Sequence, residues 1–204
     1  EMALCLVGSE MCIRDRQNTS TNFGLTMADL DGDGDIDILA GRQGSTSSAG
    51  EFLFFENIGN PASPSFASPV VHPFNLGSVY NSYGVFPELV DLDNDGDLDL
   101  VAGNYFGNQV YYQNSGTPSS PSFAIGVANP YGLSNAGFYL QGVEFADLDG
   151  DGDQDFFTGY IGGGLKYKEN SGSASSPAFG AVQNFSSYTT CLLYTSPSPR
   201  DITP

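Results

Sequence analysis

Asp29-Leu-Asp-Gly-Asp-Gly-Asp-Ile-Asp37 is a nine-residue acidic phrase that occurs three times in this chain. It returns as Asp91-Leu-Asp-Asn-Asp-Gly-Asp-Leu-Asp99 and as Asp147-Leu-Asp-Gly-Asp-Gly-Asp-Gln-Asp155. Asp and Gly favour plain solvated turns, but carboxylates this close in sequence repel one another unless a cation neutralises them. A simple turn has no need of this arrangement three times. The phrase therefore predicts one metal-binding loop in each of three repeated units.

The chemistry of the loop favours calcium, which takes several oxygen ligands at about 2.3–2.6 Å. Loop positions 1, 3 and 5 supply short carboxylates, and glycine at position 6 permits a sharp backbone reversal. Position 7 would coordinate through its backbone oxygen, which leaves its side chain free to point outward, and position 9 could close the site. We predict three Ca²⁺ sites, one per repeat. The predicted carboxylate ligands are Asp29, Asp31, Asp33, Asp37, Asp91, Asp93, Asp95, Asp99, Asp147, Asp149, Asp151 and Asp155. The predicted backbone ligands are Asp35, Asp97 and Asp153.

An EF-hand is the main competing interpretation of the loop. It needs a bidentate Glu at position 12 and a helix on each side. Position 12 is Ala40, Ala102 or Thr158 here, and the flanks are rich in Val, Phe, Tyr and Gly. Such flanks favour β-strands, so the sequence argues against an EF-hand.

The repeat extends well beyond the acidic loops. Each loop runs into an apolar strand that ends in glycine: Ile38-Leu-Ala-Gly41, Leu100-Val-Ala-Gly103 and Phe156-Phe-Thr-Gly159. A more aromatic strand follows in each copy: Phe52-Leu-Phe-Phe-Glu56, Gln109-Val-Tyr-Tyr-Gln113 and Leu165-Lys-Tyr-Lys-Glu169. A turn phrase then recurs: Asn57-Ile-Gly59, Asn114-Ser-Gly116 and Asn170-Ser-Gly172. The first loop aspartates are 62 and then 56 residues apart.

This period, with its short strands and Gly-rich turns, predicts an all-β fold: a partial β-propeller of three four-stranded antiparallel blades. In the middle blade we expect strands at 84–90, 98–102, 109–113 and 123–128, with the acidic loop between the first two. The alternation in Leu165-Lys-Tyr-Lys168 predicts a half-buried strand. Phe54, Tyr111 and Tyr167 occupy equivalent positions and are expected to be the buried aromatics between sheets.

The pattern resembles the FG-GAP/VCBS-type repeats, the calcium-binding propeller blades of integrin α-chain heads and of many secreted bacterial proteins. Phe23-Gly24 before the first loop is similar to the family's Phe-Gly pair. The family's Gly-Ala-Pro segment is replaced, for example by Ala40-Gly-Arg42, so the match is closer to the bacterial VCBS-type variant. It covers nearly all of 20–185. Because such families usually close a ring of about seven blades, the resemblance implies further propeller blades in a longer parent chain.

Both ends of the chain are interpreted as foreign. Cys191-Leu-Leu-Tyr-Thr-Ser-Pro-Ser-Pro-Arg-Asp201 and Leu6-Val-Gly-Ser-Glu-Met-Cys-Ile-Arg-Asp15 are translations of opposite strands of one sequencing-adapter DNA. We therefore assign 1–16 and 191–204 to adapter-derived tails and exclude them from fold reasoning. The native part is 17–190, with repeats at about 17–75, 76–132 and 133–190. All three cysteines lie in the tails, so no disulfide framework is expected.

Charge and hydropathy limit the possible partners. The native part keeps 20 of the 24 acidic residues and 3 of the 6 basic ones, and 15 of those 20 acids lie in the loops. So negative a chain argues against nucleic-acid binding. No stretch is long and apolar enough to span a membrane. We expect a bacterial protein that is secreted or displayed on the cell surface.

Three functions are compatible with such a chain. The first is a calcium-stabilised extracellular scaffold for adhesion or ligand binding, with a protein or glycan as partner. The second is a carbohydrate-binding, lectin-like propeller, for which Tyr105, Phe106 and Tyr160 are candidate stacking residues, although packing between blades explains them more simply. The third is part of a secreted polysaccharide-degrading enzyme. No catalytic residue is predicted, since the single His72 has no nucleophile beside it in the sequence and Glu88 and Glu144 recur at equivalent, structural positions.

Overall fold

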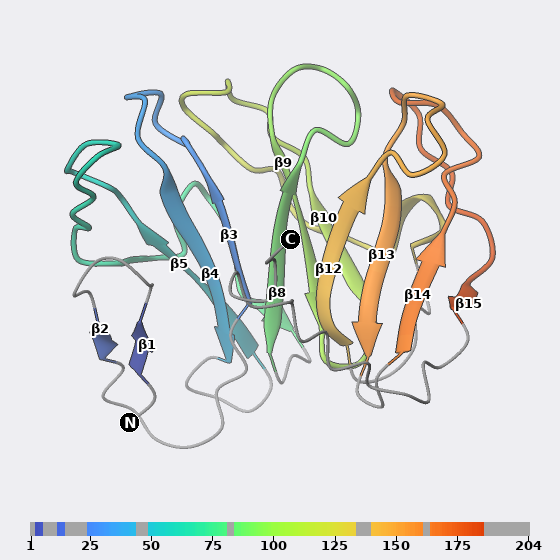
Figure 1. The fold of residues 1–204 in the computed structure, drawn as a ribbon, viewed down its shortest axis with the longest axis horizontal. Coiled ribbons are helices and arrows are strands. Elements are labelled where there is room, and N and C mark those ends of the chain that lie inside the picture. Colours follow the sequence, from blue (N-terminus) through green and yellow to red (C-terminus); the bar gives the residue numbers. More distant parts are fainter. Residues whose placement is uncertain are drawn as a thin grey trace, which may run out of the picture.

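The chain folds into three four-stranded antiparallel sheets that stand side by side (Figure 1). The computed structural model describes residues 3–5, 12–14, 24–43, 49–80, 84–133, 140–160 and 164–185. Within these ranges the structure is all-β apart from one 3-10 turn, η1 (Pro130–Gly132). No helix among the described residues has the length and apolar character needed to cross a bilayer. The predicted fold class, a partial β-propeller, is confirmed.

Consecutive strands pair in chain order within each sheet. The first sheet contains β3 (Gly24–Ala28), β4 (Asp37–Gln43), β5 (Ala49–Phe55) and β6 (Val70–Val71), and β7 (Val79–Tyr80) pairs with the start of β5. The second contains β8 (Val85–Val90), β9 (Asp99–Asn104), β10 (Gln109–Tyr112) and β11 (Val127–Ala128). The third contains β12 (Leu140–Ala146), β13 (Asp155–Tyr160), β14 (Gly164–Lys168) and β15 (Gln183–Phe185).

The strands predicted for the middle repeat agree closely with the structure, except for the last. β11 is confined to Val127–Ala128, whereas a strand over 123–128 was expected. Phe123 instead forms an isolated bridge with Asn114 and buries its ring in the core, with only 3 % of its surface exposed. Because Phe123 packs into the core, it does not extend the outermost strand, which is therefore shorter than predicted.

The assigned tails are described only in part. β1 (Ala3–Cys5) and β2 (Cys12–Arg14) form a separate two-stranded sheet that pairs with none of the three larger sheets. Residues 191–204 and Phe23 lie outside the described residues. The division of the chain into adapter-derived tails and three native repeats stays a prediction.

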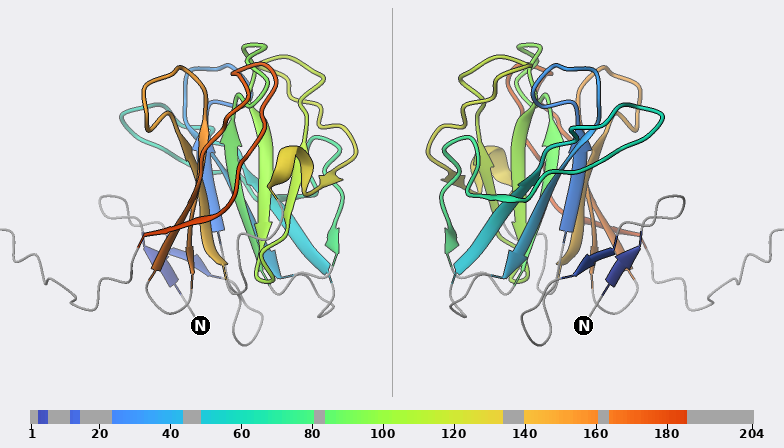
Figure 2. Two further views of the ribbon diagram at one scale, coloured as in Figure 1. Left: turned by 90° about the vertical axis from the view of Figure 1, so that its right-hand side faces the viewer. Right: turned by 90° about the vertical axis from the view of Figure 1, so that its left-hand side faces the viewer.

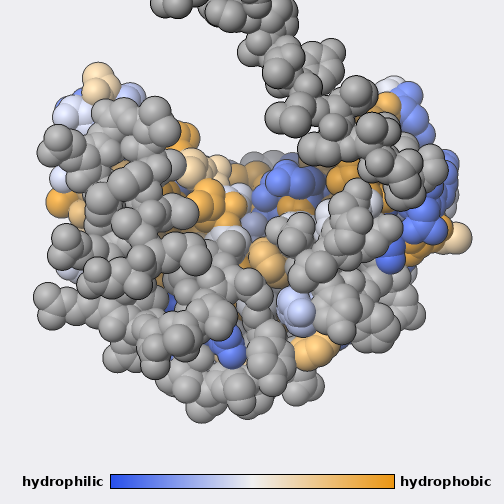
Figure 3. Space-filling view, turned by 60° about the horizontal axis from the view of Figure 1, so that its bottom comes forward, coloured by the Kyte–Doolittle hydropathy of each residue, from blue (hydrophilic) through white to orange (hydrophobic). Residues whose placement is uncertain are grey.

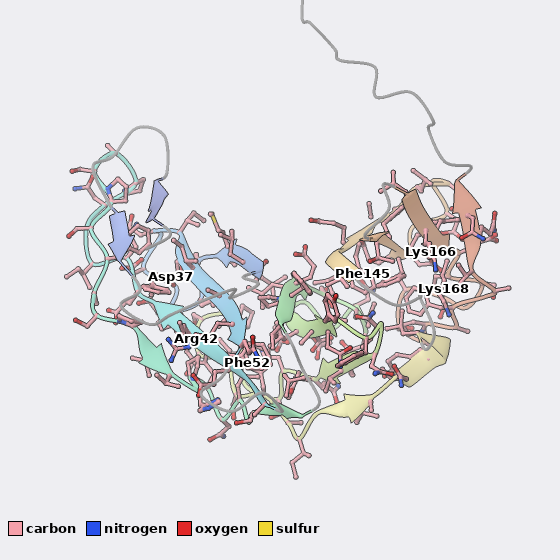
Figure 4. The ribbon with its side chains drawn as sticks, turned by 90° about the horizontal axis from the view of Figure 1, so that it is seen from below. Asp37, Arg42, Phe52, Phe145, Lys166 and Lys168 are labelled. Atoms are coloured by element: carbon pink, nitrogen blue, oxygen red, sulfur yellow. The ribbon has the colours of Figure 1, made fainter. Side chains whose placement is uncertain are left out.

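The three sheets are arranged in an open arc, with their first strands on its inner side (Figure 4). β3 packs against β8, and β8 packs against β12. In the side views, η1 lies beside β10 (Figure 2). In the space-filling view, both apolar and hydrophilic residues line the hollow on the inner side of the arc (Figure 3). The arc is the shape expected of consecutive propeller blades.

Two apolar cores join the sheets, because the two faces of the second sheet are both buried. Leu39, Phe52 and Phe54 of the first sheet pack with residues of the second that include Leu100 and Tyr112. The other face of the second sheet presents further apolar residues to the third: Phe86, Val101 and Tyr111 meet Val143, Phe145 and Phe156. Figure 4 shows Phe52 and Phe145 at the two boundaries. The predicted burial between sheets is confirmed for Phe54 and Tyr111, at 7 % and 4 % exposure; Tyr167 is also buried, at 8 % exposure, but belongs to neither core.

The recurring glycine at the end of each apolar strand marks a close approach between sheets. A Cβ atom on Gly41 would lie 2.4 Å from the carbonyl oxygen of Val85, and one on Gly103 would lie 2.7 Å from a methyl carbon of Val143. Val85 and Val143 lie in the first strands of the following sheets. Gly159, at the same position in the third sheet, has no described atom within 4 Å. Glycine is thus required where one blade meets the next.

The third sheet departs from the expected alternation. Leu165 is 51 % exposed, whereas Lys168 is only 5 % exposed and donates a hydrogen bond from Nζ to the carbonyl oxygen of Gly132. Lys168 shares a face with its cross-strand partner Phe156, and that face packs on the second sheet. The strand predicted to be half-buried thus has Leu165 on its exposed side and Lys168 on its buried side, and burial lowers the pKa of Lys168.

Candidate metal loops

The three acidic phrases form equivalent loops, each joining the first and second strands of its sheet. All three lie at the same edge of the molecule, the top edge in Figure 1. The position-6 glycines have φ values of 95°, 96° and 95° at Gly34, Gly96 and Gly152. These values lie in the left-handed region that favours glycine, so the predicted need for glycine at this reversal is confirmed. The flanks are strands, which removes the EF-hand alternative.

The first aspartate of each loop is held by the backbone of the reversal. Oδ2 of Asp29 accepts a hydrogen bond from the amide of Gly34 at 3.0 Å. The matching bonds from Gly96 to Asp91 and from Gly152 to Asp147 are both 3.1 Å. Each carboxylate is thereby fixed toward the inside of its own loop, before any cation is considered.

Each loop gathers three carboxylates into a space that one ion could fill. One oxygen from each member of a group lies within 4.8 Å of the others. The groups are Asp29, Asp31 and Asp37; Asp91, Asp93 and Asp95; and Asp147, Asp149 and Asp151. All nine are among the predicted ligands. Asp33 in the first loop and the position-9 residues Asp99 and Asp155 fall outside these groups.

The position-7 side chains differ from expectation, because they do not all point outward. Asp35 and Asp153 are only 6 % and 5 % exposed, although the loops lie at the surface. Oδ1 of Asp153 and Oδ1 of Asp97 are buried and lack a hydrogen-bond partner among the described residues. Burial, followed by repulsion from the other loop carboxylates, raises the pKa of Asp35, Asp97 and Asp153. A buried carboxylate oxygen without a donor suits a bound cation, so the residues present fit calcium.

The position-9 aspartates are structural anchors in all three repeats. Asp37 is 1 % exposed, and its two oxygens accept hydrogen bonds from the amides of Leu30 and Asn57, at 3.0 and 2.8 Å. Asp99 and Asp155 accept the equivalent pairs of amides, so each ties its loop to the turn after the third strand. These carboxylates therefore hold the loop in place, whether or not they also contact an ion.

The asparagines at the start of the recurring turn phrase complete this network. Oδ1 of Asn57 accepts hydrogen bonds from the amides of Gly59 and Ser65, at 3.1 and 3.0 Å. Asn114 and Asn170 make the same pair of bonds and are 3 % and 2 % exposed. The sequence showed these residues only as turn formers. Their recurrence at one fixed distance after every loop was the signal for a buried structural role.

A tyrosine hydroxyl reaches the anchor in the second and third repeats. The Tyr111 hydroxyl donates to Oδ2 of Asp99 at 2.8 Å, and the Tyr167 hydroxyl bonds to Asp155. Burial raises the pKa of Asp99 to about 6, and the bonds from Asn114 and Tyr111 only partly oppose that rise. Phe54 stands at this position in the first repeat, so the first anchor lacks this donor.

The other residues singled out from the sequence lie away from the loops. Tyr105 and Phe106 occupy the turn between β9 and β10, at the opposite end of β9 from the metal loop, and their rings pack edge to face at 5.6 Å. The side chain of Tyr160 lies outside the described residues. His72 Nε2 is 3.5 Å from the hydroxyl of Ser78, which is long for a hydrogen bond.

Glu88 and Glu144 lie on neighbouring first strands, three residues before their loops. Half-buried Glu88 accepts a hydrogen bond from the hydroxyl of Thr26 on β3. Burial, and then the charge of Glu144, raises the pKa of Glu88 from 4.5 to about 7, and the Thr26 bond partly opposes the rise. The folded protein therefore holds this proton more tightly than the unfolded chain does.

The resulting prediction is a loss of stability with rising pH. Between pH about 4.5 and 7, Glu88 is already ionised in the unfolded chain but still protonated in the folded protein. The contribution of Glu88 to the free energy of unfolding is therefore complete at low pH and is lost as the pH rises through the pKa of the folded state. We expect Glu88 to contribute about 1–2 kcal/mol to this loss after allowance for solvent screening. The free energy of unfolding, measured with urea in chelator at pH 5 and at pH 8, should decrease less between the two pH values for Glu88→Gln than for the wild type. An equal decrease in both proteins would contradict this assignment.

Comparison with known proteins agrees with this architecture. The comparison with curated proteins found no match. A family model described as an FG-GAP-like repeat matches residues 91–158. The matched segment starts at Asp91, the first residue of the second acidic loop. It continues through β9, β10 and β11 of the second sheet and β12 of the third, and ends within β13. Parts of the second and third repeats of this chain, residues 91–158, are thus similar to the FG-GAP-like repeat.

Proposed function

We propose that this chain is part of a calcium-stabilised extracellular β-propeller scaffold for adhesion or ligand binding, with one Ca²⁺ ion in the first loop of each sheet. The observation that carries the proposal is the repeated inward-facing carboxylate group. Three carboxylates converge within 4.8 Å in every loop, and buried oxygens of Asp97 and Asp153 lack a donor among the described residues. Calcium would supply the positive charge and the multiple oxygen contacts that this arrangement needs.

The role of the ion in this proposal is structural. Each loop joins the innermost strand of a sheet to the second strand, and its anchor ties it to the turn after the third strand. An ion that neutralises the loop would therefore secure three strands together. Metal that binds only the folded loop adds its binding free energy to folding. No catalytic step is part of the proposal, because the loop carboxylates are assigned to holding the ion.

The extracellular location follows from the same chemistry. Surface loops of this kind belong with modules whose calcium sites have dissociation constants of about 10⁻⁴–10⁻³ M, which fill only where calcium is abundant. The native repeats also contain no cysteine, so the proposed ions would take the place that disulfides hold in many secreted domains. A protein or glycan ligand would then bind to the surface that the pinned sheets present.

Equilibrium dialysis against calcium tests the proposal directly. We expect the chain to take up about three ions, and Asp147→Ala to take up about two, because Asp147 is one of the three converging carboxylates of the third loop. Magnesium is the matched control, since it requires rigid octahedral geometry and keeps its water. No saturable calcium uptake up to about 10 mM, well above the expected range, would refute the proposal.

A further inference from the structure

The residue that follows the third strand of the second sheet contacts the metal loop of that sheet. Nε2 of Gln113 donates a hydrogen bond to Oδ2 of Asp93 at 2.6 Å. Gln113 comes directly after β10, and its side chain is exposed. The contact brings a side chain from outside the acidic phrase to loop position 3, which is one of the converging carboxylates.

The first and third repeats carry glutamate at this position. The carbonyl oxygens of Glu56, Gln113 and Glu169 accept equivalent hydrogen bonds from Ala67, Ala124 and Gly180, at 2.9, 2.8 and 2.9 Å. In each case the next residue is the asparagine whose amide binds the position-9 anchor at 2.8 Å. The backbone therefore makes the same hydrogen bonds at these three positions. The side chains of Glu and Gln also have the same length. A carboxylate at 56 or 169 can reach the loop of its own sheet as Gln113 does.

Glu169 and the third loop both lie close enough to Tyr167 for their charges to act on its hydroxyl. The Tyr167 hydroxyl is bonded to Asp155, and the charges of both Glu169 and Asp149 act on it. Asp149 is the loop residue equivalent to Asp93. The third loop also contains Asp153, which is 5 % exposed and has a buried Oδ1 without a donor among the described residues. That oxygen indicates a ligand in the same loop independently of the exposed acids around it.

Replacing the amide by a carboxylate changes what the loop can hold. The Gln113 amide gives Asp93 a donor, and so satisfies one carboxylate oxygen without any ion. A glutamate can give no donor when ionised, and its charge adds to the repulsion within the loop. The extra carboxylate is favourable only with a cation between it and the loop, and ligand charge is one of the quantities that sets calcium affinity.

We propose that Glu56 and Glu169 are additional carboxylates of the first and third metal loops, and that these two loops bind calcium more tightly than the second, where Gln113 takes their place. The inference rests on the proposed calcium sites but goes beyond them, because it assigns residues outside the acidic phrase and ranks the three loops. One extra charge at about 5 Å corresponds to a difference of roughly three- to tenfold in the dissociation constant.

Stepwise calcium titration by calorimetry tests this ranking with isosteric substitutions. The wild type should show two tighter sites and one weaker site. Gln113→Glu should convert the weaker site, so that all three become tight, whereas Glu56→Gln together with Glu169→Gln should leave three weak sites. Gln43→Glu is the matched control, because it adds the same charge at the far end of β4 from the loop and should change no constant by more than about twofold. Far-ultraviolet circular dichroism should be the same for all variants.

Two outcomes are contrary and can be told apart. If calcium binds but the substitutions at 56, 113 and 169 shift no constant by more than the Gln43→Glu control does, the ranking is wrong and the calcium sites stand. If no variant takes up calcium, both the proposed function and the added carboxylates are refuted.

Discussion

Replacing Asp99 with alanine is expected to lower the free energy of unfolding by about 3–5 kcal/mol, with calcium present or absent. Asp99 has no exposed surface. It accepts hydrogen bonds from the amides of Leu92 and Asn114 and from the hydroxyl of Tyr111, at 3.3, 2.8 and 2.8 Å. Alanine would leave three buried donors without an acceptor, and each such donor costs about 1–3 kcal/mol.

Urea unfolding in calcium and in chelator measures this effect, and Asp93→Ala is the matched comparison. Asp93 belongs to the converging group of the same loop, but it lies nearer the surface. Its replacement should lower stability in calcium and have little effect in chelator, because its proposed role is to hold the ion. If the cost of Asp99→Ala instead disappears in chelator, Asp99 acts as a calcium ligand and the anchoring role is wrong.

Most of the fold could be predicted from the sequence because it is repeated. A single aromatic strand such as Gln109–Tyr112 is ambiguous on its own, but three aligned copies fix its place after an acidic loop and an apolar strand. The recurring glycine after each apolar strand was visible too. Its reason was not, because the approach of Gly41 to Val85 depends on how one sheet packs against the next.

The parts that escaped prediction are those decided by packing between elements. Lys168 is buried because its strand face meets the second sheet and its amine reaches Gly132, which no alternation along one strand reveals. Phe123 leaves its predicted strand for the core. In both cases a contact more than 30 residues away along the chain, or between two sheets, outweighs the local pattern.

The candidate site also has a part that the local sequence predicted and a part that only tertiary contacts decide. Loop spacing predicted that positions 1, 3 and 5 converge, which holds in the second and third loops, whereas in the first loop Asp37 at position 9 takes the place of Asp33. It could not separate a carboxylate that faces an ion from one that binds backbone amides. Asp35 and Asp37 are both buried and only two residues apart, yet Asp37 accepts the amides of Leu30 and Asn57 and also belongs to the converging group of its loop. Asn57 itself is 20 residues away from Asp37, so the anchor is a tertiary contact that a loop motif does not contain.

Removing calcium is expected to have the larger effect on the whole protein, with a fall in the melting temperature of about 15–30 °C. When free calcium is about a hundred times the dissociation constant, each site adds about 2.7 kcal/mol to stability. Three such sites would add about 8 kcal/mol, and 1 kcal/mol shifts the melting temperature of a domain of this size by about 2–4 °C. The chain without calcium also keeps the burial and the unrelieved repulsion that together raise the pKa of Asp97 and Asp153.

Differential scanning calorimetry in calcium, in chelator and after calcium is restored measures this fall and its reversal. Magnesium at the same concentration should restore little of the loss, because its rigid octahedral demand suits these loops poorly. Sodium chloride separates binding from simple screening. Exposed carboxylates repel less as ionic strength rises, so some recovery of the melting temperature in sodium chloride is expected. Screening by dissolved ions, however, still leaves the buried Oδ1 of Asp153 without a partner among the described residues. A melting temperature that salt alone restores fully would mean that the loops are crowded acidic turns, and that no specific ion holds the sheets together.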